Sequence, residues 1–223
     1  MRQVSSRFMI REKFFLLFLF CVALLYAAGL NPFLPFGDSG HYYLLAQSLT
    51  QGKGYTFIAG PVPSPDTAYP FIYPVLLTPF VLAAPGNFFA PKVLTVFVTL
   101  FLIAAIYFCL PRIYRAKNAS WVAFAYALSP FVAMYSRTML TDIFFAFFAL
   151  LAIFFVDRYA HAQKRAFLYL VCAAASFFLA FYTRSIGFTI LGAAVCFFIA
   201  RKQLKRGAVL CATFGCLMSF WLI

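Results

Sequence analysis

The chain has 223 residues, of which 65% are hydrophobic and 10% charged, and its mean hydropathy is +0.93. A soluble domain of this size does not bury so much apolar surface, so the composition predicts an integral membrane protein. The net charge of +13 is typical of nucleic-acid binding only in a soluble chain. Here the basic residues lie in short segments between apolar runs, and we expect no nucleic-acid partner. The six cysteines all lie inside apolar runs and none has Cys-x-x-Cys spacing or a nearby His, so the sequence indicates neither a zinc site nor a disulfide framework.

Seven apolar runs follow one another and are predicted to be transmembrane helices, because lipid cannot satisfy open backbone groups. They are Phe14–Leu30, Phe88–Leu110, Ala119–Tyr135, Thr138–Val156, Ala166–Thr183, Ser185–Ala200 and Ala208–Ile223. The predicted fold is an all-α, polytopic membrane protein with a single domain over residues 1–223. The last run ends without flanking charge, so we expect the N-terminal part of something longer. The first run could also be a cleaved signal peptide, but the later spans need a starting orientation, which favours a retained helix.

The distribution of Lys and Arg predicts a cytoplasmic N-terminus. With that orientation the inner segments carry Arg2, Arg7, Arg11, Lys13, Arg112, Arg115, Lys117, Arg158, Lys164, Arg165, Arg201, Lys202, Lys205 and Arg206. The outer segments carry Lys53, Lys92, Arg137 and Arg184, together with three of the five acidic residues, Asp38, Asp66 and Asp142. We therefore expect a multi-pass protein of the inner (plasma) membrane whose chemistry takes place on the extracytoplasmic side.

Residues 31–87 form one long outer loop that holds most of the prolines. Long loops in compact proteins are usually functional or disordered, and this one is too aromatic for a disordered segment. Residues 39–50 have helical spacing and predict an amphipathic interfacial helix with tyrosines at headgroup depth. Residues 69–79 are too rich in proline for a full span and predict a second interfacial segment. Asp38 precedes the interfacial helix predicted at residues 39–50, so it is either the N-cap of that helix, a catalytic carboxylate or both.

Two further outer positions carry charge next to a predicted span. Asp142 follows Arg137 by five residues, and the pair is either a salt bridge or helix cap, or part of a site. Arg184 lies at the turn between the fifth and sixth spans, where it either snorkels to lipid headgroups or binds substrate. His41, three residues after Asp38, is more typical of a polar surface position than of a metal ligand. Together these groups could hold an anionic headgroup beside a reacting hydroxyl.

The sequence resembles the polytopic type C (GT-C) glycosyltransferases, especially the protein O-mannosyltransferase and aminoarabinose transferase branch. The resemblance rests on Asp38-x-x-x-Tyr42, Gly54-Tyr55, Tyr73-Pro74-Val75-Leu76-Leu77, the Arg137-to-Asp142 segment and Thr183-Arg184-Ser185-Ile186-Gly187. It implies a glycosyltransferase that uses a sugar on a polyprenyl phosphate, inverts the anomeric centre and transfers to a lipid, glycan or protein acceptor among membrane lipids.

The resemblance also implies roles for individual residues. Asp38 and Asp142 take the catalytic positions, while Arg137, Arg184, Tyr42 and Tyr55 take substrate-binding positions. Ser39 stands where many relatives have Glu, which argues against a divalent metal, although a metal remains open. Tyr69-Pro70-Phe71 replaces a Lys-Pro-Pro-like segment, which leaves Arg184 and Arg137 to bind phosphate. A transporter or lipid flippase, and a non-catalytic membrane scaffold, are the alternatives from other functional classes.

Overall fold

The computed structural model describes residues 2–33, 37–60 and 62–219, apart from the side chains of residues 2–10 and 117. This part of the chain confirms the all-α prediction. Its helices are α1 Arg2–Ala28, α2 Asp38–Thr50, α3 Ile72–Ala83, α4 Phe89–Tyr114, α5 Trp121–Ala127, α6 Pro130–Ser136, α7 Asp142–His161, α8 Ala166–Thr183, α9 Gly187–Ala200 and α10 Leu204–Ser219. A 3₁₀ turn covers Lys117–Ser120, and β1 (Thr56–Phe57) pairs antiparallel with β2 (Ser64–Pro65).

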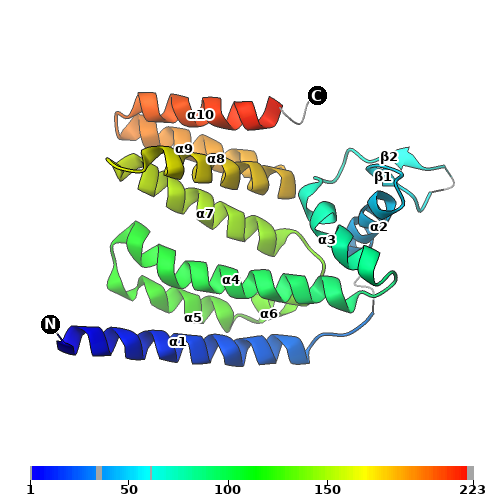
Figure 1. The fold of residues 1–223 in the computed structure, drawn as a ribbon, viewed down its shortest axis with the longest axis horizontal. Coiled ribbons are helices and arrows are strands. Elements are labelled where there is room, and N and C mark those ends of the chain that lie inside the picture. Colours follow the sequence, from blue (N-terminus) through cyan, green and yellow to red (C-terminus); the bar gives the residue numbers. More distant parts are fainter. Residues whose placement is uncertain (1, 34–36, 61, 220–223) are drawn as a thin grey trace.

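The long helices lie side by side with roughly parallel axes, while α2, α3 and the β1–β2 hairpin gather at one end of them (Figure 1). Helix α7 packs against α4 and α8, and α8 in turn packs against α9 and α10. Small residues such as Ala173, Ala174 and Ala180 are fully buried in α8 and allow this close approach. The packed bundle therefore supports the loops and short helices at its end.

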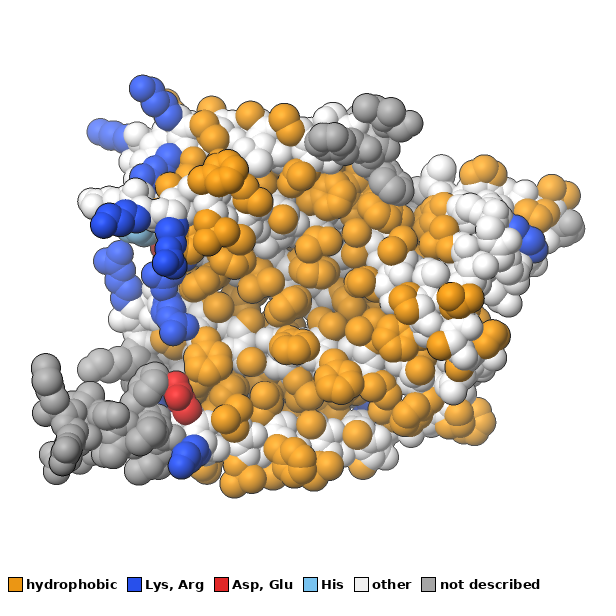
Figure 2. Space-filling view, viewed as in Figure 1, with side chains coloured by type: hydrophobic (Ala, Val, Ile, Leu, Met, Phe, Trp, Pro, Cys, Tyr) orange, Lys and Arg blue, Asp and Glu red, His pale blue; other side chains and the backbone are white. Residues whose placement is uncertain are grey.

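Three described helices are long and apolar enough to cross a membrane: α4, α7 and α8, with mean hydropathies of 2.7, 2.0 and 1.9. Hydrophobic side chains cover the middle of the face seen in Figure 2. Large hydrophobic residues of the long helices are also exposed: Phe97, Phe101 and Phe167 are each more than half exposed. An apolar belt of this kind indicates contact with lipid, so this is a membrane protein. The count of seven spans stays a prediction, and the end of the seventh falls on residues 220–223, outside the described part.

Basic side chains gather at the end of the bundle away from α2 and α3 (Figure 2). The connections α4–α5, α7–α8 and α9–α10 all lie at this end (Figure 1). These connections and the helix turns beside them carry Arg112, Arg115, Arg158, Lys164, Arg165, Arg201, Lys202, Lys205 and Arg206. Arg206 donates to the carbonyl oxygens of Tyr159, Ala160 and Ala162 at the C-terminus of α7. A guanidinium there satisfies backbone acceptors that a helix end leaves open and opposes the negative end of the helix dipole.

The predicted continuous span Ala119–Tyr135 is wrong, because this segment is divided into α5 and α6. The break falls at Leu128–Ser129, and Pro130 begins α6. Proline lacks a backbone N–H and disfavours helical geometry in the residue before it; Ser129 is extended, with φ −67° and ψ 127°. The Tyr26 hydroxyl of α1 donates to the Ala127 carbonyl oxygen at 2.7 Å, so the break is tied to the neighbouring helix.

Helices α2 and α3 pack against each other and not merely on a membrane surface. Tyr42, Tyr43 and Ala46 of α2 share a buried cluster with Tyr73 and Leu77 of α3. Met139 and Phe144, from the α6–α7 region, belong to the same cluster. The α2 tyrosines therefore point into this cluster, whereas the sequence had predicted them at headgroup depth. This packing fixes the start of α2 relative to the start of α7.

Candidate active site

A cavity of about 520 Å³ opens where four segments of the fold meet. Its walls come from the start of α2, residues 68–70 of the outer loop, the α6–α7 connection and the α8–α9 turn. The side chains that bring chemistry to it are Asp38, Tyr42, Tyr69, Thr141, Asp142 and Arg184. Four of the six predicted site residues, Asp38, Asp142, Arg184 and Tyr42, thus line one cavity, although as many as 146 positions separate them in the sequence.

Asp38 is the first residue of α2, and it does not cap the helix. The N-cap position is Gly37, whose φ of 73° is one that glycine adopts readily, and the helix has no side-chain cap. The Asp38 Oδ1 atom instead accepts a hydrogen bond of 2.8 Å from the Tyr69 hydroxyl. The capping interpretation of Asp38 is therefore wrong, and its carboxylate is directed to the cavity wall formed by Tyr69.

The same hydrogen bond controls the protonation of Tyr69. It is the main reason that the pKa of Tyr69 is raised to about 12. Ionisation of Tyr69 would break the hydrogen bond that it donates and place a second negative charge beside the Asp38 carboxylate. Tyr69 therefore remains a neutral hydroxyl donor at physiological pH. The sequence placed Tyr69 in a proline-rich segment without giving it a role, and no local pattern connects it with a residue 31 positions earlier.

Asp142 and Arg184 form an ion pair across the cavity. Asp142 is the first residue of α7, and its Oδ1 atom contacts the Arg184 guanidinium from the turn between α8 and α9. The turn is closed by a 2.8 Å hydrogen bond from the Gly187 N–H to the Arg184 carbonyl oxygen. A carboxylate and a guanidinium at one cavity can respectively accept a proton and stabilise an anion.

Arg137 does not reach the cavity and does not pair with Asp142. Its guanidinium donates to the carbonyl oxygens of Leu25 at 2.8 Å and Tyr26 at 3.3 Å, near the C-terminus of α1. A Cβ atom at Gly29 would lie 2.1 Å from the guanidinium carbon, so the arginine fills the space that this glycine leaves. The proposed Arg137–Asp142 salt bridge is wrong, and Arg137 instead anchors α1 to the α6–α7 connection.

The two predicted substrate-binding tyrosines lie in different places. Tyr42 lines the cavity, and its hydroxyl lies 3.4 Å from the Thr141 hydroxyl; burial raises the pKa of Tyr42. Tyr55 lines a neighbouring cavity of about 240 Å³ on the other side of residues 68–70. Its hydroxyl donates to the carbonyl oxygens of Tyr69 at 2.8 Å and Pro70 at 3.2 Å. Tyr55 thus holds the wall between the two cavities, and burial raises its pKa well above the usual range.

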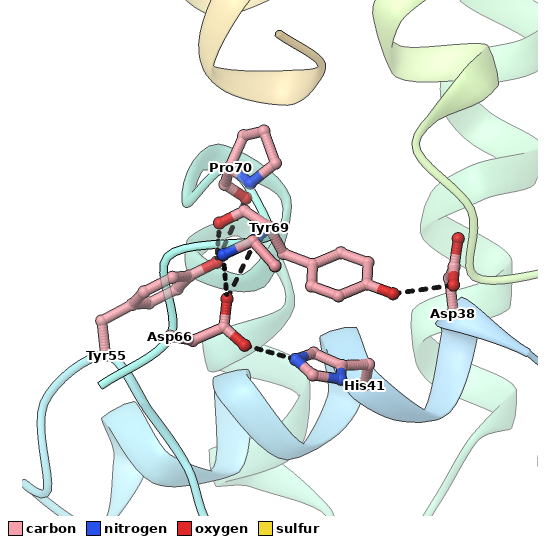
Figure 3. A network of polar contacts seen from close by, with 7 residues as sticks. Asp38, His41, Tyr55, Asp66, Tyr69 and Pro70 are labelled. Atoms are coloured by element: carbon pink, nitrogen blue, oxygen red, sulfur yellow. Dashed lines mark hydrogen bonds and ion pairs between the residues drawn. The ribbon is translucent and has the colours of Figure 1, made fainter. Parts of the chain in front are cut away.

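His41 pairs with Asp66 and not with Asp38. Its Nε2 atom lies 2.5 Å from Asp66 Oδ2 (Figure 3). Among the described residues no group of three His, Cys, Asp or Glu side chains is arranged to hold a metal ion.

A family model described as dolichyl-phosphate-mannose-protein mannosyltransferase matches residues 69–223. The matched region contains Tyr69, Asp142 and Arg184, and it begins after Asp38 and Tyr42. No curated protein and no solved structure matches the chain.

Proposed function

The chain belongs to the dolichyl-phosphate-mannose-protein mannosyltransferase family, and from that premise we propose that it moves a sugar from a polyprenyl-phosphate donor to an acceptor hydroxyl at the extracytoplasmic membrane face. Membership makes it a membrane glycosyltransferase of the mannosyltransferase type. The donor, the inversion of the anomeric centre and the membrane face are our proposals. We also assign residues 1–223 to one transferase domain of the inner membrane, with residues 31–87 as its outer loop.

The observation that carries this proposal is the meeting of Asp38, Asp142 and Arg184 at one cavity of about 520 Å³. The segments that line the cavity lie at the end of the bundle opposite the basic connections (Figure 1). The positive-inside rule assigns the basic end to the cytoplasm. On that orientation the cavity opens near the outer interface, where both the headgroup of a lipid-linked sugar and an external acceptor have access.

The proposed reaction is a single displacement. Asp38 accepts the proton of the acceptor hydroxyl as that oxygen forms a bond to the anomeric carbon of the donor sugar. The bond between the anomeric carbon and the phosphate oxygen breaks at the same time, and its electrons remain on the polyprenyl phosphate. Attack from the face opposite the leaving group inverts the anomeric centre. The Tyr69 hydroxyl occupies Asp38 Oδ1, so Oδ2 is the oxygen we assign to the proton.

Arg184 is the group we assign to the leaving phosphate. A guanidinium presents several N–H donors in a planar fork that matches phosphate oxygens, and it keeps its charge at all relevant pH values. Asp142 occupies one edge of that fork in the structure and so holds the guanidinium at the cavity. We assign Asp142 to the orientation of Arg184 and of the acceptor, and Asp38 to proton transfer.

A transporter is less well supported than a transferase. Transporters place polar groups or broken helices near the bilayer midplane. Within α4 and α8, the buried Thr99 and Ser176 hydroxyls bond to their own helix: Thr99 donates to the Thr95 carbonyl oxygen, and Ser176 donates to that of Cys172. The charged groups of α7 and α8 stand at or next to the helix ends. In α7 and α8 the charge is therefore concentrated towards the helix ends and not at mid-span.

The test is a transfer assay with the full-length protein in proteoliposomes and radiolabelled polyprenyl-phosphate mannose as the first donor. Asp38→Asn keeps the size and the hydrogen-bond acceptor of Asp38 but removes the base, and should lower transfer by about 10²–10⁴-fold. Asp157→Asn is the matched control, because Asp157 lies on α7 near its opposite, basic end and contacts His161 at 3.3 Å. We expect the control to transfer at the wild-type rate.

The outcomes separate the proposal's parts. No transfer by folded wild-type protein with mannose, other hexose and pentose donors would reject the proposed function and favour a scaffold. Wild-type transfer that survives in Asp38→Asn would keep the enzyme and reject Asp38 as the base.

A further inference from the structure

A chain of polar contacts connects the proposed base to a buried acid deep in the outer loop (Figure 3). Asp38 and His41 stand three residues apart on α2, which brings them to neighbouring positions on one side of the helix. From Asp38 the chain runs to the Tyr69 hydroxyl, and from His41 it runs to Asp66. The two branches meet because Asp66 binds the backbone of Tyr69.

Asp66 is the centre of this arrangement. Its Oδ1 atom accepts the backbone N–H groups of Ala68 and Tyr69, each at 3.0 Å, and its Oδ2 atom accepts from His41 at 2.5 Å. Only 6% of its side chain is exposed. A carboxylate removed from water is costly unless it is paired and hydrogen-bonded, and here every contact serves to hold the turn that carries Tyr69.

Aromatic packing fixes the same turn from a second direction. The His41 ring stacks on Phe57 with 4.3 Å between ring centroids and on Tyr69 with 4.1 Å. The Tyr69 ring also meets Tyr42 edge-on at 5.0 Å. His41 therefore fixes Tyr69 in two ways. Through Asp66 it holds the Tyr69 backbone, and by stacking it holds the plane of the Tyr69 ring, so rotation of that ring is restricted.

We infer that His41 and Asp66 are positioning residues for the transfer reaction, which act through Tyr69 to fix the carboxylate of Asp38. The inference rests on the proposed role of Asp38 as the base. A hydrogen bond to one carboxylate oxygen fixes the rotation of the group and hence the direction of the other oxygen. The rate of a displacement depends steeply on that direction, so loss of the contact should lower kcat and leave donor binding intact.

The first experiment compares Tyr69→Phe and Asp66→Asn with wild type in the same transfer assay. Tyr69→Phe keeps the ring and removes the hydroxyl donor, while Asp66→Asn keeps the size and removes the charge. Each should lower kcat by about ten- to hundredfold, with the KM for donor changed by less than about twofold. The kcat of the double variant should be no lower than that of the slower single variant, because both substitutions interrupt the same series of contacts from Asp66 through Tyr69 to Asp38.

Two variants of His41 separate its hydrogen bond from its stacking. His41→Phe keeps an aromatic ring between Phe57 and Tyr69 and removes the donor to Asp66, so we expect it to resemble Asp66→Asn. His41→Gln keeps an N–H donor, so it should recover part of the lost kcat. Thr56→Val is the matched control: it removes a 2.9 Å hydrogen bond to the Lys53 carbonyl oxygen in the same loop and should have wild-type kcat.

The results distinguish this inference from the proposed function. Wild-type kcat in Tyr69→Phe, or independent and multiplicative losses in the double variant, would overturn the inference even if Asp38→Asn is inactive. An equal loss in Thr56→Val would also overturn it, since the loop would then act only by its overall stability. Activity in Asp38→Asn would instead reject the base assignment on which the inference rests.

Discussion

Arg184 and Asp142 form their ion pair at the surface of the cavity, with 42% and 43% of the two side chains still exposed. An ion pair so open to water contributes little to folding, about 0–1 kcal/mol. The contact is therefore better understood as holding a guanidinium ready for an incoming anion than as holding α7 to α8.

Replacement of Arg184 should separate activity from stability. Arg184→Gln should lower kcat by about 10²–10³-fold, because a donor to the developing phosphate charge is lost. The free energy of unfolding should change by less than about 1 kcal/mol. Transfer kinetics and denaturant unfolding of the same preparation measure both, with Arg201→Gln at the basic end as control. A large loss of stability in Arg184→Gln would show that the pair is mainly structural.

Gly187 should tolerate no side chain. A Cβ atom there would lie 2.7 Å from the Ala180 carbonyl carbon and the Phe181 nitrogen of α8, and backbone atoms cannot yield as a flexible side chain can. We expect Gly187→Ala to lower the unfolding temperature and, by displacing the Arg184 turn, to lower transfer. Gly192→Ala on the same helix is the control, because its Cβ would meet nothing within 4 Å. Equal effects of the two substitutions would contradict the close α8–α9 contact.

Lys92 should stabilise the fold by fastening the start of the outer loop. Only 2% of it is exposed, and its ammonium donates to the Asn31 carbonyl oxygen, the Asn31 side-chain oxygen and the Phe33 carbonyl oxygen at 2.7–3.0 Å. Lys92→Met keeps the length of the side chain and should lower the free energy of unfolding by roughly 1.5–3 kcal/mol. Lys53→Met, at an exposed position, should have no effect. An unchanged unfolding midpoint in Lys92→Met would show that water replaces these contacts.

The Tyr69–Asp38 hydrogen bond gives a signature at alkaline pH. Tyrosine in an unfolded chain ionises near pH 10, whereas the pKa of Tyr69 in the folded protein is raised to about 12. Because the folded pKa is the higher one, the contribution to stability is complete below about pH 10 and is lost as the pH rises towards 12. The ultraviolet difference between wild type and Tyr69→Phe should therefore show a group that titrates near 12. A titration near 10 would mean that the contact with Asp38 is not made in solution.

Local sequence patterns predicted much of the fold. The bounds of α8 are those of the apolar run Ala166–Thr183, and α2 begins one residue before the periodic segment 39–50. The break at Pro130 was missed because the run around it is continuously apolar. Its proline was the signal that could have revealed it, since proline disfavours helical geometry in the preceding residue.

The candidate site was predictable only in part. Asp38, Asp142 and Arg184 are conspicuous because charge is rare in this chain and each was predicted on its outer side. Their true partners were not predictable, because Arg137 is nearer to Asp142 in sequence than Arg184 is. The His41–Asp66 contact joins residues 25 positions apart through a loop with no periodic pattern, so only the packed structure brings them together.

The separation between the cavity and the basic connections has a consequence for where the substrate comes from. Helix α4 has 26 residues and is therefore about 39 Å long at 1.5 Å per residue, which exceeds the hydrocarbon thickness of a bilayer, about 30 Å. On the proposed orientation, nucleotide-activated sugars in the cytoplasm face the wrong end of the molecule and have no route to Asp38. Each turnover would then depend on a separate step that carries the lipid-bound sugar from the inner leaflet to the outer one.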